Sequence, residues 1–487
     1  MNTTLIVFVV IYLLGTLALG LWAGTRIKNS TDFAIAGRRL PLVMVITTTF
    51  ATWFGAETVM GIPAKFVQGG LNAIVEDPFG AGTCLILVGL FFATKLYRLN
   101  LLTIGDYYRQ RYGKGIEVFC SAAIILSYLG WVAAQITALG LVFNVLTNGA
   151  MSETAGMVVG TLAVLVYVVV GGFLAVAWTD FIQMIVLVLG MSVIAVFSAD
   201  LAGGAGVVLD KIASQDLWRF LPAPSFKDVA FFIGAALTMM LGSIPQQDVY
   251  QRVMSAKDAR TARNGAVIGG TAYIVFAFVP MFIVASAVVV MGEQALTIAK
   301  DDYQRLLPTY VMGKMPLLMQ ILFFGALLSA IKSTSSATLL APSTSFVENI
   351  LKNLRPHMGD RQQLRAMRWS IVAFAGAVLA YAIAMKGTPI FDLVSSAYQV
   401  TLVGAFVPLV FGLYWRRAST QGAIVSVASG IAVWVLFMPQ VSPLGEAFPG
   451  QLAGLLAALV GMLAGSLAPQ WLANRHEADH HTRGLNA

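Results

Sequence analysis

A run of hydroxyl side chains lies in the middle of an apolar stretch, residues 316–347, and includes Ser336. Within it, Ala330, Ser333 and Thr334 are spaced i, i+3 and i+4, so they share one face of a helix. Hydroxyl and carbonyl oxygens are hard ligands that suit a small cation such as Na⁺. The alternative is that these hydroxyls bond back to the preceding turn or hold helices together. A run of this length beside a charged residue favours the cation site.

That charged residue is Lys332, a cation within an apolar span, where charge is costly and is usually paired or functional. It could pair with a carboxylate such as Glu57 or Asp180, or it could extend toward the cytoplasm. It could also take up and release a proton, since burial makes an ammonium easier to deprotonate. Lys332 lies about 100° around the helix from Ser333, which favours pairing with a carboxylate away from the ion face.

Two other apolar stretches contain helix breakers at corresponding places. The first is interrupted around Gly55, Gly61 and Pro63, and the second around Gly242 and Pro245. Gly and Pro free backbone groups, which in a lipid environment must face protein, water or a ligand. Ordinary kinks are the alternative. Matched breaks five spans apart, each with polar neighbours, indicate two five-helix repeats with a transport site at mid-membrane.

Aromatic and acidic residues near the first break are candidates for substrate binding. Glu57 and Thr58 lie in the break, and Glu57 could bond a substrate hydroxyl or amine, or the freed backbone amides. Trp53 and Trp131, with Tyr128, could form part of an aromatic box for a quaternary amine. The alternative is that these rings fill helix interfaces.

Two adjacent amides near the second break favour another kind of substrate. Gln246 and Gln247 offer hydrogen bonds that suit a carboxylate, an amino acid or a sugar.

The elements that must position these residues are membrane-spanning helices. The chain is 58% hydrophobic and 11% charged, whereas a soluble domain carries about 25% charged residues. With about 20 apolar residues needed for each crossing, the sequence predicts thirteen spans: 4–24, 40–67, 72–94, 117–146, 154–175, 178–199, 228–251, 264–292, 316–347, 369–386, 391–414, 420–438 and 451–472. The glycine-rich turn between the fifth and sixth spans makes that division the hardest to place.

Basic residues follow the parity of the connections. Of 31 Lys and Arg residues, 22 lie in alternate connections and the C-terminal tail. Because basic loops stay in the cytoplasm, we expect an outside N-terminus, a cytoplasmic C-terminus and a multi-pass location in the plasma membrane, as in a bacterial inner membrane. The charge therefore reports topology, and we expect no nucleic-acid partner.

The spans divide the chain into five parts. They are an N-terminal helix with the first cytoplasmic loop (1–39), a first five-helix repeat (40–199), an extracytoplasmic loop (200–227), a second repeat (228–414), and two C-terminal helices with a short cytoplasmic tail (415–487).

The polar pattern favours a transporter over three other classes. A sensor needs a signalling domain, a channel needs a polar path along the whole crossing, and an enzyme needs a nucleophile–base or metal set. Only Cys84 and Cys120 occur, and no His lies in a span. We therefore expect no catalytic activity and no obligatory protein partner.

Three motifs resemble the sodium:solute symporter family, and the likeness covers nearly the whole chain. They are Gly171–Asp180 with Gln183, Ile244–Arg252 and Ser329–Ser345. The resemblance implies an all-α membrane protein with a LeuT-like 5+5 inverted repeat, alternating access and uptake driven by Na⁺. The segments Phe50–Trp53 and Gly89–Ala93, with Trp131, resemble the high-affinity choline transporter branch, although that branch has Trp at Gln246. Proline symporters are the other branch with a similar pattern.

Carried over residue by residue, the family's sodium site uses carbonyls in the first break and oxygens of the ninth span. Here these are the carbonyls of Ala51, Phe54 and Ala330 and the hydroxyls of Ser333 and Thr334. The family's acidic residue in the sixth span falls on Asp180, which in some members holds a second sodium with two serines. The matching positions are Ser336 and Ala337, and because alanine has no side-chain oxygen we expect one coupling ion.

Together these features predict a sodium-coupled symporter that imports a small amine or amino acid, such as choline, betaine or proline. A monocarboxylate or sugar symporter, a proton-coupled transporter and a transport-like sensor are the alternatives. The expected partners are the small organic solute and the lipid bilayer.

Overall fold

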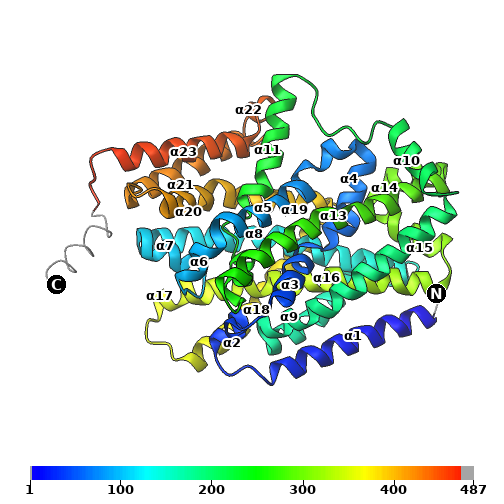
Figure 1. The fold of residues 1–487 in the computed structure, drawn as a ribbon, viewed down its shortest axis with the longest axis horizontal. Helices are drawn as coiled ribbons and strands as arrows, with labels where there is room; N and C mark the ends of the chain where they lie inside the picture. The colour runs from blue at the N-terminus through cyan, green and yellow to red at the C-terminus, as the bar shows by residue number, and fades with distance from the viewer. Residues whose placement is uncertain (1–2, 473–487) are drawn as a thin grey trace.

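The computed structural model describes residues 3–472, apart from the side chains of residues 300 and 301. Within that part every regular element is a helix, and the only β-type pairing is one isolated bridge between Leu40 and Ala256 (Figure 1). The expected cytoplasmic tail falls mostly on residues 473–487, which lie outside the described residues. The predicted all-helical class is confirmed.

Nine helical stretches in the described chain are long and apolar enough to cross a membrane. They are α1 (Thr3–Gly24), η3 to α6 (Leu71–Arg98), α8 (Lys114–Leu146), α9 (Glu153–Leu201), α13 (Ala259–Met291), α16 to α17 (Leu317–Leu354), α18 (Asp360–Ala384), α19 to α20 (Ile390–Tyr414) and α23 (Gly450–Leu467). Shorter helices connect them: α2 (Ser30–Ile35), α7 (Ile104–Tyr112), α10 (Ala205–Ser214), α14 (Glu293–Asp302), α15 (Leu306–Lys314) and α22 (Leu444–Ala447).

Both predicted breaks are present as bent helix pairs. The first pair is α3 (Leu42–Trp53) and the stretch Glu57–Gly69, which comprises η2 and α4 and is bent by 56°. The second is α11 (Phe226–Gly242) and α12 (Gln247–Ser255), bent by 43°. Each bend falls where Gly or Pro interrupts the apolar pattern, so helix-breaking residues locate the irregular backbone.

Helix α9 contains both the fifth and the sixth predicted spans. Its 49 residues would extend about 74 Å if straight, more than twice the roughly 30 Å hydrocarbon core. Gly172 breaks the regular backbone with φ 51° and ψ −153°. A Cβ at this position would lie 2.5 Å from the Phe33 ring, so both the conformation and the close packing require glycine.

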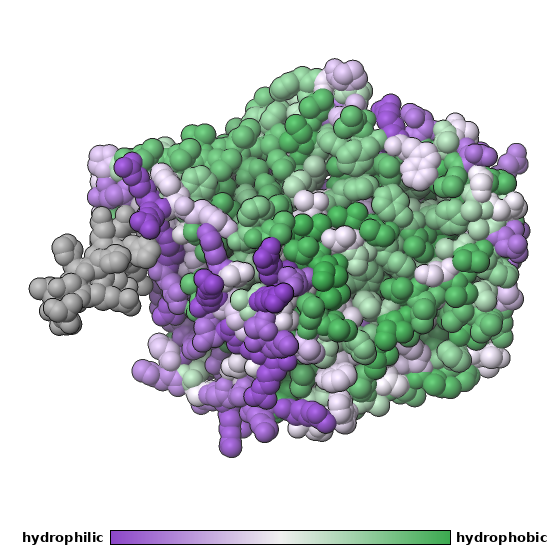
Figure 2. All heavy atoms as spheres, in the orientation of Figure 1, coloured by the Kyte–Doolittle hydropathy of each residue, from purple (hydrophilic) through white to green (hydrophobic). Residues whose placement is uncertain are grey.

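The count of thirteen crossings stays a prediction. Helix α21 (Thr420–Leu436), where the twelfth span was expected, has 17 residues and is shorter than each of the nine spanning stretches. The surface agrees with a multi-pass membrane protein: Figure 2 shows a broad hydrophobic face with hydrophilic residues gathered at its ends. Large apolar side chains exposed on the described surface include Leu189, Val196 and Val275, which are 62%, 73% and 65% exposed.

The site depends on how a few helices pack. Helix α16 (Leu317–Ser345) contacts α9, α8 and α3, and α9 contacts α1 and α3. In Figure 1, α1, α9 and α16 run side by side. The hydroxyl-rich middle of α16 therefore faces the first break on one side and the N-terminal helix on another.

Replacing Gly172 with alanine tests the break in α9. We expect Gly172→Ala to lower stability by about 1–3 kcal/mol, the usual cost of such a backbone conformation in a residue with a Cβ. Thermal unfolding of the purified protein in detergent measures the change. Gly206→Ala is the control, because Gly206 lies in α10 with no atom within 4 Å of an added Cβ. Equal melting temperatures for the two variants would contradict this role.

Candidate sodium and substrate sites

The first break leaves several backbone carbonyls without a backbone donor, among them those of Ala51 and Phe54. Helix α3 ends at Trp53, and Phe54 has non-helical φ −89° and ψ 69°. In the described chain, the bonds that continue past the helix end go to the carbonyls of Phe50 and Gly55, and the carbonyls of Ala51 and Phe54 receive none. These are the two carbonyls that the family resemblance assigns to a sodium ion.

The side chains of α16 complete an oxygen-lined position opposite this break. The Thr334 hydroxyl is buried and has no hydrogen-bond partner in the described chain. A Cβ added at Gly55 would lie 2.6 Å from the Thr334 Oγ1 atom, so this hydroxyl faces the break directly. An unpartnered buried hydroxyl beside two free carbonyls fits Na⁺, which is held by oxygen ligands.

Asp180 joins the two sides of this position. The Ser333 hydroxyl donates to one Asp180 carboxylate oxygen at 2.6 Å, and Thr48 of α3 donates to the other at 2.5 Å. Asp180 itself lies on α9 and is fully buried. Ser333 still has lone pairs available for a cation while its proton is directed to the carboxylate. The carboxylate thus places negative charge one hydroxyl away from the candidate ion.

The residues expected at a second ion position offer few ligands. Ser336 Oγ donates to the Ser333 carbonyl at 2.8 Å, and Ala337 has no side-chain oxygen. This geometry agrees with one coupling ion, which stays a prediction.

The predicted seventh span ends at residue 251 and leaves Arg252 in the cytoplasmic connection that follows, and this is wrong. Helix α12 continues to Ser255, and Arg252 is only 2% exposed. Its guanidinium donates to the Thr52 hydroxyl on α3 and, at 2.6 Å, to the Asp248 carbonyl on α12. The half-helix extends one turn past the predicted end of the span, which carries this cation inside the protein.

Lys332 does not pair with a carboxylate, so the favoured prediction for it is wrong. Its ammonium donates to the Thr16 hydroxyl on α1 and lies 4.3 Å from the centre of the Tyr167 ring. No ion pair involving Lys332 is present among the described residues, and the side chain is only 2% exposed, so it does not reach the cytoplasm either. Lys332 lies about 100° around the helix from Ser333. On that side its neighbour is α1, and neither Asp180 nor Glu57 is its partner.

Three aromatic rings meet beside the first break, and we call them the aromatic triad: Trp53, Trp131 and Tyr398. Their ring centres lie 5.4 Å (Trp53–Trp131), 5.9 Å (Trp53–Tyr398) and 5.5 Å (Trp131–Tyr398) apart. Tyr128 stacks on Trp131 at 6.1 Å. The sequence indicated the two tryptophans but not Tyr398, which is one aromatic residue among many in apolar spans.

Glu57 forms the polar edge of the triad. It accepts hydrogen bonds from Trp131 Nε1 at 3.1 Å and Gln135 Nε2 at 2.5 Å. Gln135 in turn accepts from the Ala56 amide at 2.9 Å, which is a backbone group freed by the break. Gln135 was missed, since a single amide in an apolar helix gives no signal of its own. The Glu57 carboxylate therefore supports the broken backbone through Gln135, and it also orients the Trp131 ring.

Thr58 and its neighbours extend this network away from the triad. The Thr58 hydroxyl bonds to the Trp53 carbonyl at 3.1 Å and to Tyr273 at 3.0 Å, and Tyr273 donates to Asp77. Asp77 is 1% exposed, and sequence reasoning did not select it.

The two glutamines of the second break lie in different surroundings. Gln246 Nε2 donates to Ser127 at 2.9 Å, and its carbonyl oxygen has no partner in the described chain. Gln247 instead accepts from the Ile104 amide at the start of α7, at 2.9 Å. Gln247 thus holds a connecting helix, whereas Gln246 keeps a free acceptor.

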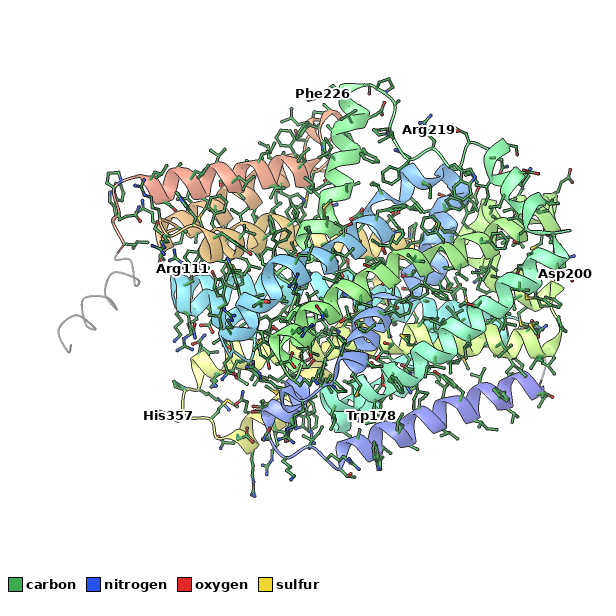
Figure 3. The ribbon with its side chains drawn as sticks, in the orientation of Figure 1. Arg111, Trp178, Asp200, Arg219, Phe226 and His357 are labelled. Atoms are coloured by element: carbon green, nitrogen blue, oxygen red, sulfur yellow. The ribbon has the colours of Figure 1, made fainter. Side chains whose placement is uncertain are left out.

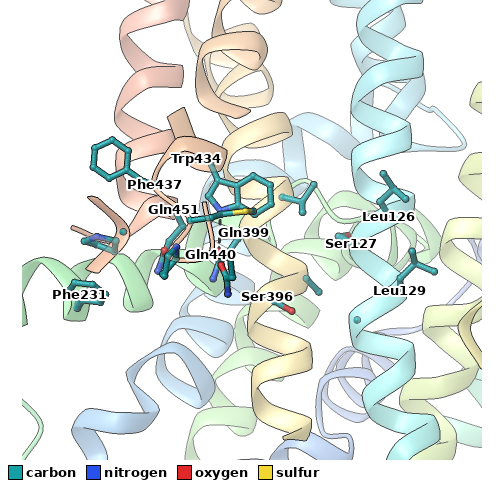
Figure 4. A pocket seen from close by; sticks show the side chains of 18 of the residues that line it. Leu126, Ser127, Leu129, Phe231, Ser396, Gln399, Trp434, Phe437, Gln440 and Gln451 are labelled. Atoms are coloured by element: carbon teal, nitrogen blue, oxygen red, sulfur yellow. Dashed lines mark hydrogen bonds between the residues drawn. The ribbon is translucent and has the colours of Figure 1, made fainter. Parts of the chain in front are cut away.

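A cavity of about 600 Å³ lies between α8, α19 and the C-terminal helices, and no residue of the triad lines it. Figure 4 shows its polar and aromatic side chains, among them Ser127, Ser396, Gln399, Trp434, Gln440 and Gln451. Gly130 and Ala397 line it and are the chain neighbours of Trp131 and Tyr398. Its lining side chains are all uncharged, so the cavity offers hydrogen bonds and apolar contacts.

The broken helices and the oxygen-lined position define a cation-coupled transporter, and comparison with known proteins gives the family. The model of the sodium:solute symporter family matches residues 33–430, and the chain belongs to this family.

The sequences of known relatives match this chain along most of their own length. The high-affinity choline transporter 1 of Caenorhabditis elegans is 25% identical over 88% of this chain and 77% of its own length, and the human one is 26% identical over 88% and 75%. The sodium/pantothenate symporter of Escherichia coli is 25% identical over 96% of this chain and 98% of its own.

Solved structures confirm the fold. A Na⁺-coupled sialic acid symporter in a substrate-bound outward-open state has a TM-score of 0.83 at 19% identity, covering 96% of this chain and 99% of that one. MhsT in complex with L-phenylalanine has a TM-score of 0.54 at 16% identity, covering 88% and 98%. The LeuT-like fold is therefore confirmed. The protein is a sodium-coupled symporter that imports a small organic solute, and Na⁺ is its coupling ion.

Removing a hydroxyl from α16 tests the sodium position. Thr334→Ala should raise the Na⁺ concentration for half-maximal uptake by about tenfold, because a ligand to a charged species contributes about 1.5–3 kcal/mol. Ser333→Ala should act in the same direction. Ser343→Ala is the matched control, since its hydroxyl only bonds to the Leu339 carbonyl on the same helix. An unchanged Na⁺ requirement in Thr334→Ala would rule out this position.

Replacing Lys332 with methionine separates its structural role from a role in proton coupling. Because the ammonium is buried without a carboxylate, Lys332→Met should leave stability equal or improved. Sodium-driven uptake and its dependence on external pH should both remain. Uptake and melting temperature in parallel measure this, and loss of pH dependence with intact folding would instead assign the lysine to proton coupling.

Proposed function

We propose that this symporter imports a small organic cation of the choline class. The observation that carries the proposal is the aromatic triad, in which three rings pack together beside the break with Glu57 bonded at the edge. Ring faces attract quaternary ammonium groups, which cannot donate a conventional hydrogen bond. Relatives named as choline transporters support the same substrate class.

A zwitterion such as betaine or proline is the second candidate. The free carbonyl oxygen of Gln246 and the uncharged lining of the adjacent cavity favour a substrate with hydrogen-bonding groups beyond a cation. Pantothenate and sialic acid symporters among the relatives show that the family also carries carboxylates. A monocarboxylate or a sugar is supported by the same Gln246 amide. The aromatic triad supports it less, because such a solute brings no ammonium group to the rings.

The coupling ion in this proposal is held by the carbonyls of Ala51, Phe54 and Ala330 and the hydroxyls of Ser333 and Thr334. Asp180 attracts the ion through Ser333 and, with Ser336, marks its route toward the cytoplasm. Trp53, Trp131, Glu57, Thr58 and Gln246 are proposed to surround or support the substrate, while Gln247 acts through α7.

The proposed arrangement places repeats at residues 40–199 and 228–414, with the N-terminus outside and the C-terminus in the cytoplasm. The distribution of basic residues supports this orientation, and the proposed location is a bacterial inner membrane. The transporter is proposed to work without an obligatory protein partner, without nucleic acid and without catalysing a reaction on its solute.

Uptake into proteoliposomes tests the substrate. Choline, betaine, proline, a monocarboxylate and a sugar would each be offered with an inward sodium gradient and, separately, an inward proton gradient. We expect sodium-driven accumulation of choline. Accumulation of betaine or proline without choline would select the second candidate, and accumulation driven by protons alone would contradict sodium coupling.

Removing one ring of the triad tests how the substrate is held. Trp53→Ala should raise the KM for choline on the order of tenfold, because a desolvated cation–π contact contributes up to about 2 kcal/mol. Trp22→Ala is the control, since Trp22 is 42% exposed on α1. Unchanged KM in Trp53→Ala would show that this ring only packs the helices.

A further inference from the structure

A second cavity lies at the opposite end of α16 from its N-terminus, where the chain turns from α17 (Lys352–Leu354) into α18. Its volume is about 480 Å³, within the roughly 300–1,000 Å³ range of small-molecule sites. The lining residues are Leu351, Arg355, Pro356, His357, Met358, Gln362, Arg365 and Ala366. None of them takes part in the sodium or substrate positions.

The charge of this cavity is positive and uncompensated. Neither Arg355 nor Arg365 forms an ion pair within the described part of the chain. The nearby acids are engaged elsewhere: Glu348 pairs with Lys352 at 2.6 Å, and Asp360 accepts from the Ser30 amide and hydroxyl at 3.1 and 2.6 Å. Two guanidinium groups in one cavity are suited to a phosphate, which arginine binds through its planar fork.

Exposed apolar side chains place the cavity at the edge of the membrane. Leu354 precedes it and is 77% exposed, and Trp369 follows it one turn after Arg365 and is 72% exposed. Tryptophan is enriched at the membrane–water interface. Figure 3 shows His357 at the lower left end of the molecule, where Figure 2 shows the densest hydrophilic surface. The basic cavity is thus flanked in the chain by two exposed apolar side chains of the kind found at a membrane interface.

The tendency of basic loops to stay in the cytoplasm explains why this connection is basic. It does not explain why two of its arginines line the same cavity. The tendency of Lys and Arg to remain in the cytoplasm depends on their number in a loop. It does not require Arg355 and Arg365 to share a cavity with apolar residues. Arg361 lies on the same connection but outside the cavity lining. A basic residue of this connection therefore need not line the cavity.

We propose that this cavity binds the headgroup of an anionic phospholipid. Arg355 and Arg365 hold the phosphate, Gln362 and His357 hydrogen-bond the polar headgroup, and the acyl chains lie on Leu354 and Trp369. Basic pockets at the cytoplasmic ends of membrane helices are known to suit such lipids. Because α16 carries Ser333 and Thr334 and continues directly into α17, the bound lipid steadies the helix that holds the coupling ion.

Lipid retention by the whole protein tests the proposal without reference to any substrate. The protein would be purified from nanodiscs of phosphatidylcholine with and without phosphatidylglycerol, and retained lipid would be measured by native mass spectrometry. The double variant Arg355→Gln/Arg365→Gln should bind phosphatidylglycerol about tenfold more weakly. The double variant Arg361→Gln/Arg417→Gln removes the same charge outside the cavity and should retain the lipid.

Three results would overturn the proposal. Equal loss in both double variants would mean general attraction between a basic face and anionic lipid. No retained phosphatidylglycerol in the unmodified protein would mean that the cavity does not bind it. Binding of inorganic phosphate alone with the same dependence on Arg355 and Arg365, and no added retention of phosphatidylglycerol, would assign the cavity to a free anion.

Discussion

The rest of the structure depends on one constraint, which is that backbone groups freed inside a membrane must find partners within the protein. The break at Phe54 releases carbonyls and amides, and each is dealt with differently. The Ala56 amide donates to Gln135, while the carbonyls of Ala51 and Phe54 accept no hydrogen bond in the described chain and are the ones proposed to hold the ion. Gln135 is itself fixed by Glu57, and Glu57 also holds Trp131. One irregular turn therefore links the ion position to the rings proposed to hold the solute.

Asp180 makes the ion position sensitive to the arrangement of three helices. Its two oxygens are shared between Thr48 of α3 and Ser333 of α16, while the residue itself belongs to α9. A cation beside Ser333 and Thr334 strengthens this arrangement because it places positive charge near the carboxylate. Separating α3 from α16 breaks one of the two hydrogen bonds and disperses the oxygen ligands together. At the proposed site, ion binding and helix position are thus parts of one equilibrium, which is what coupling requires.

Much of this organisation could be predicted from the sequence, because it depends on local composition. Apolar length gives the crossings, Gly and Pro give the breaks, and i, i+3, i+4 spacing places Ser333 and Thr334 on one face. The direction of Lys332 could not be predicted, since helical rotation does not say which neighbouring helix lies on that side. Tyr398 and Gln135 depend on packing between distant segments and have no local signal. Arg252 was misplaced because half of a broken helix is too short and too polar for its end to be found from hydropathy.

The contact between Lys332 and α1 has a consequence for how the protein is made. Thr16 and Tyr167 belong to segments that leave the ribosome well before α16 does. When α16 enters the bilayer, its lysine is costly until it meets these partners, so the earlier helices must already be in place. The first helix, which precedes the two proposed repeats, thus prepares the position of a much later one. The contacts of the Lys332 ammonium therefore require the helices to assemble in the order in which they are synthesised.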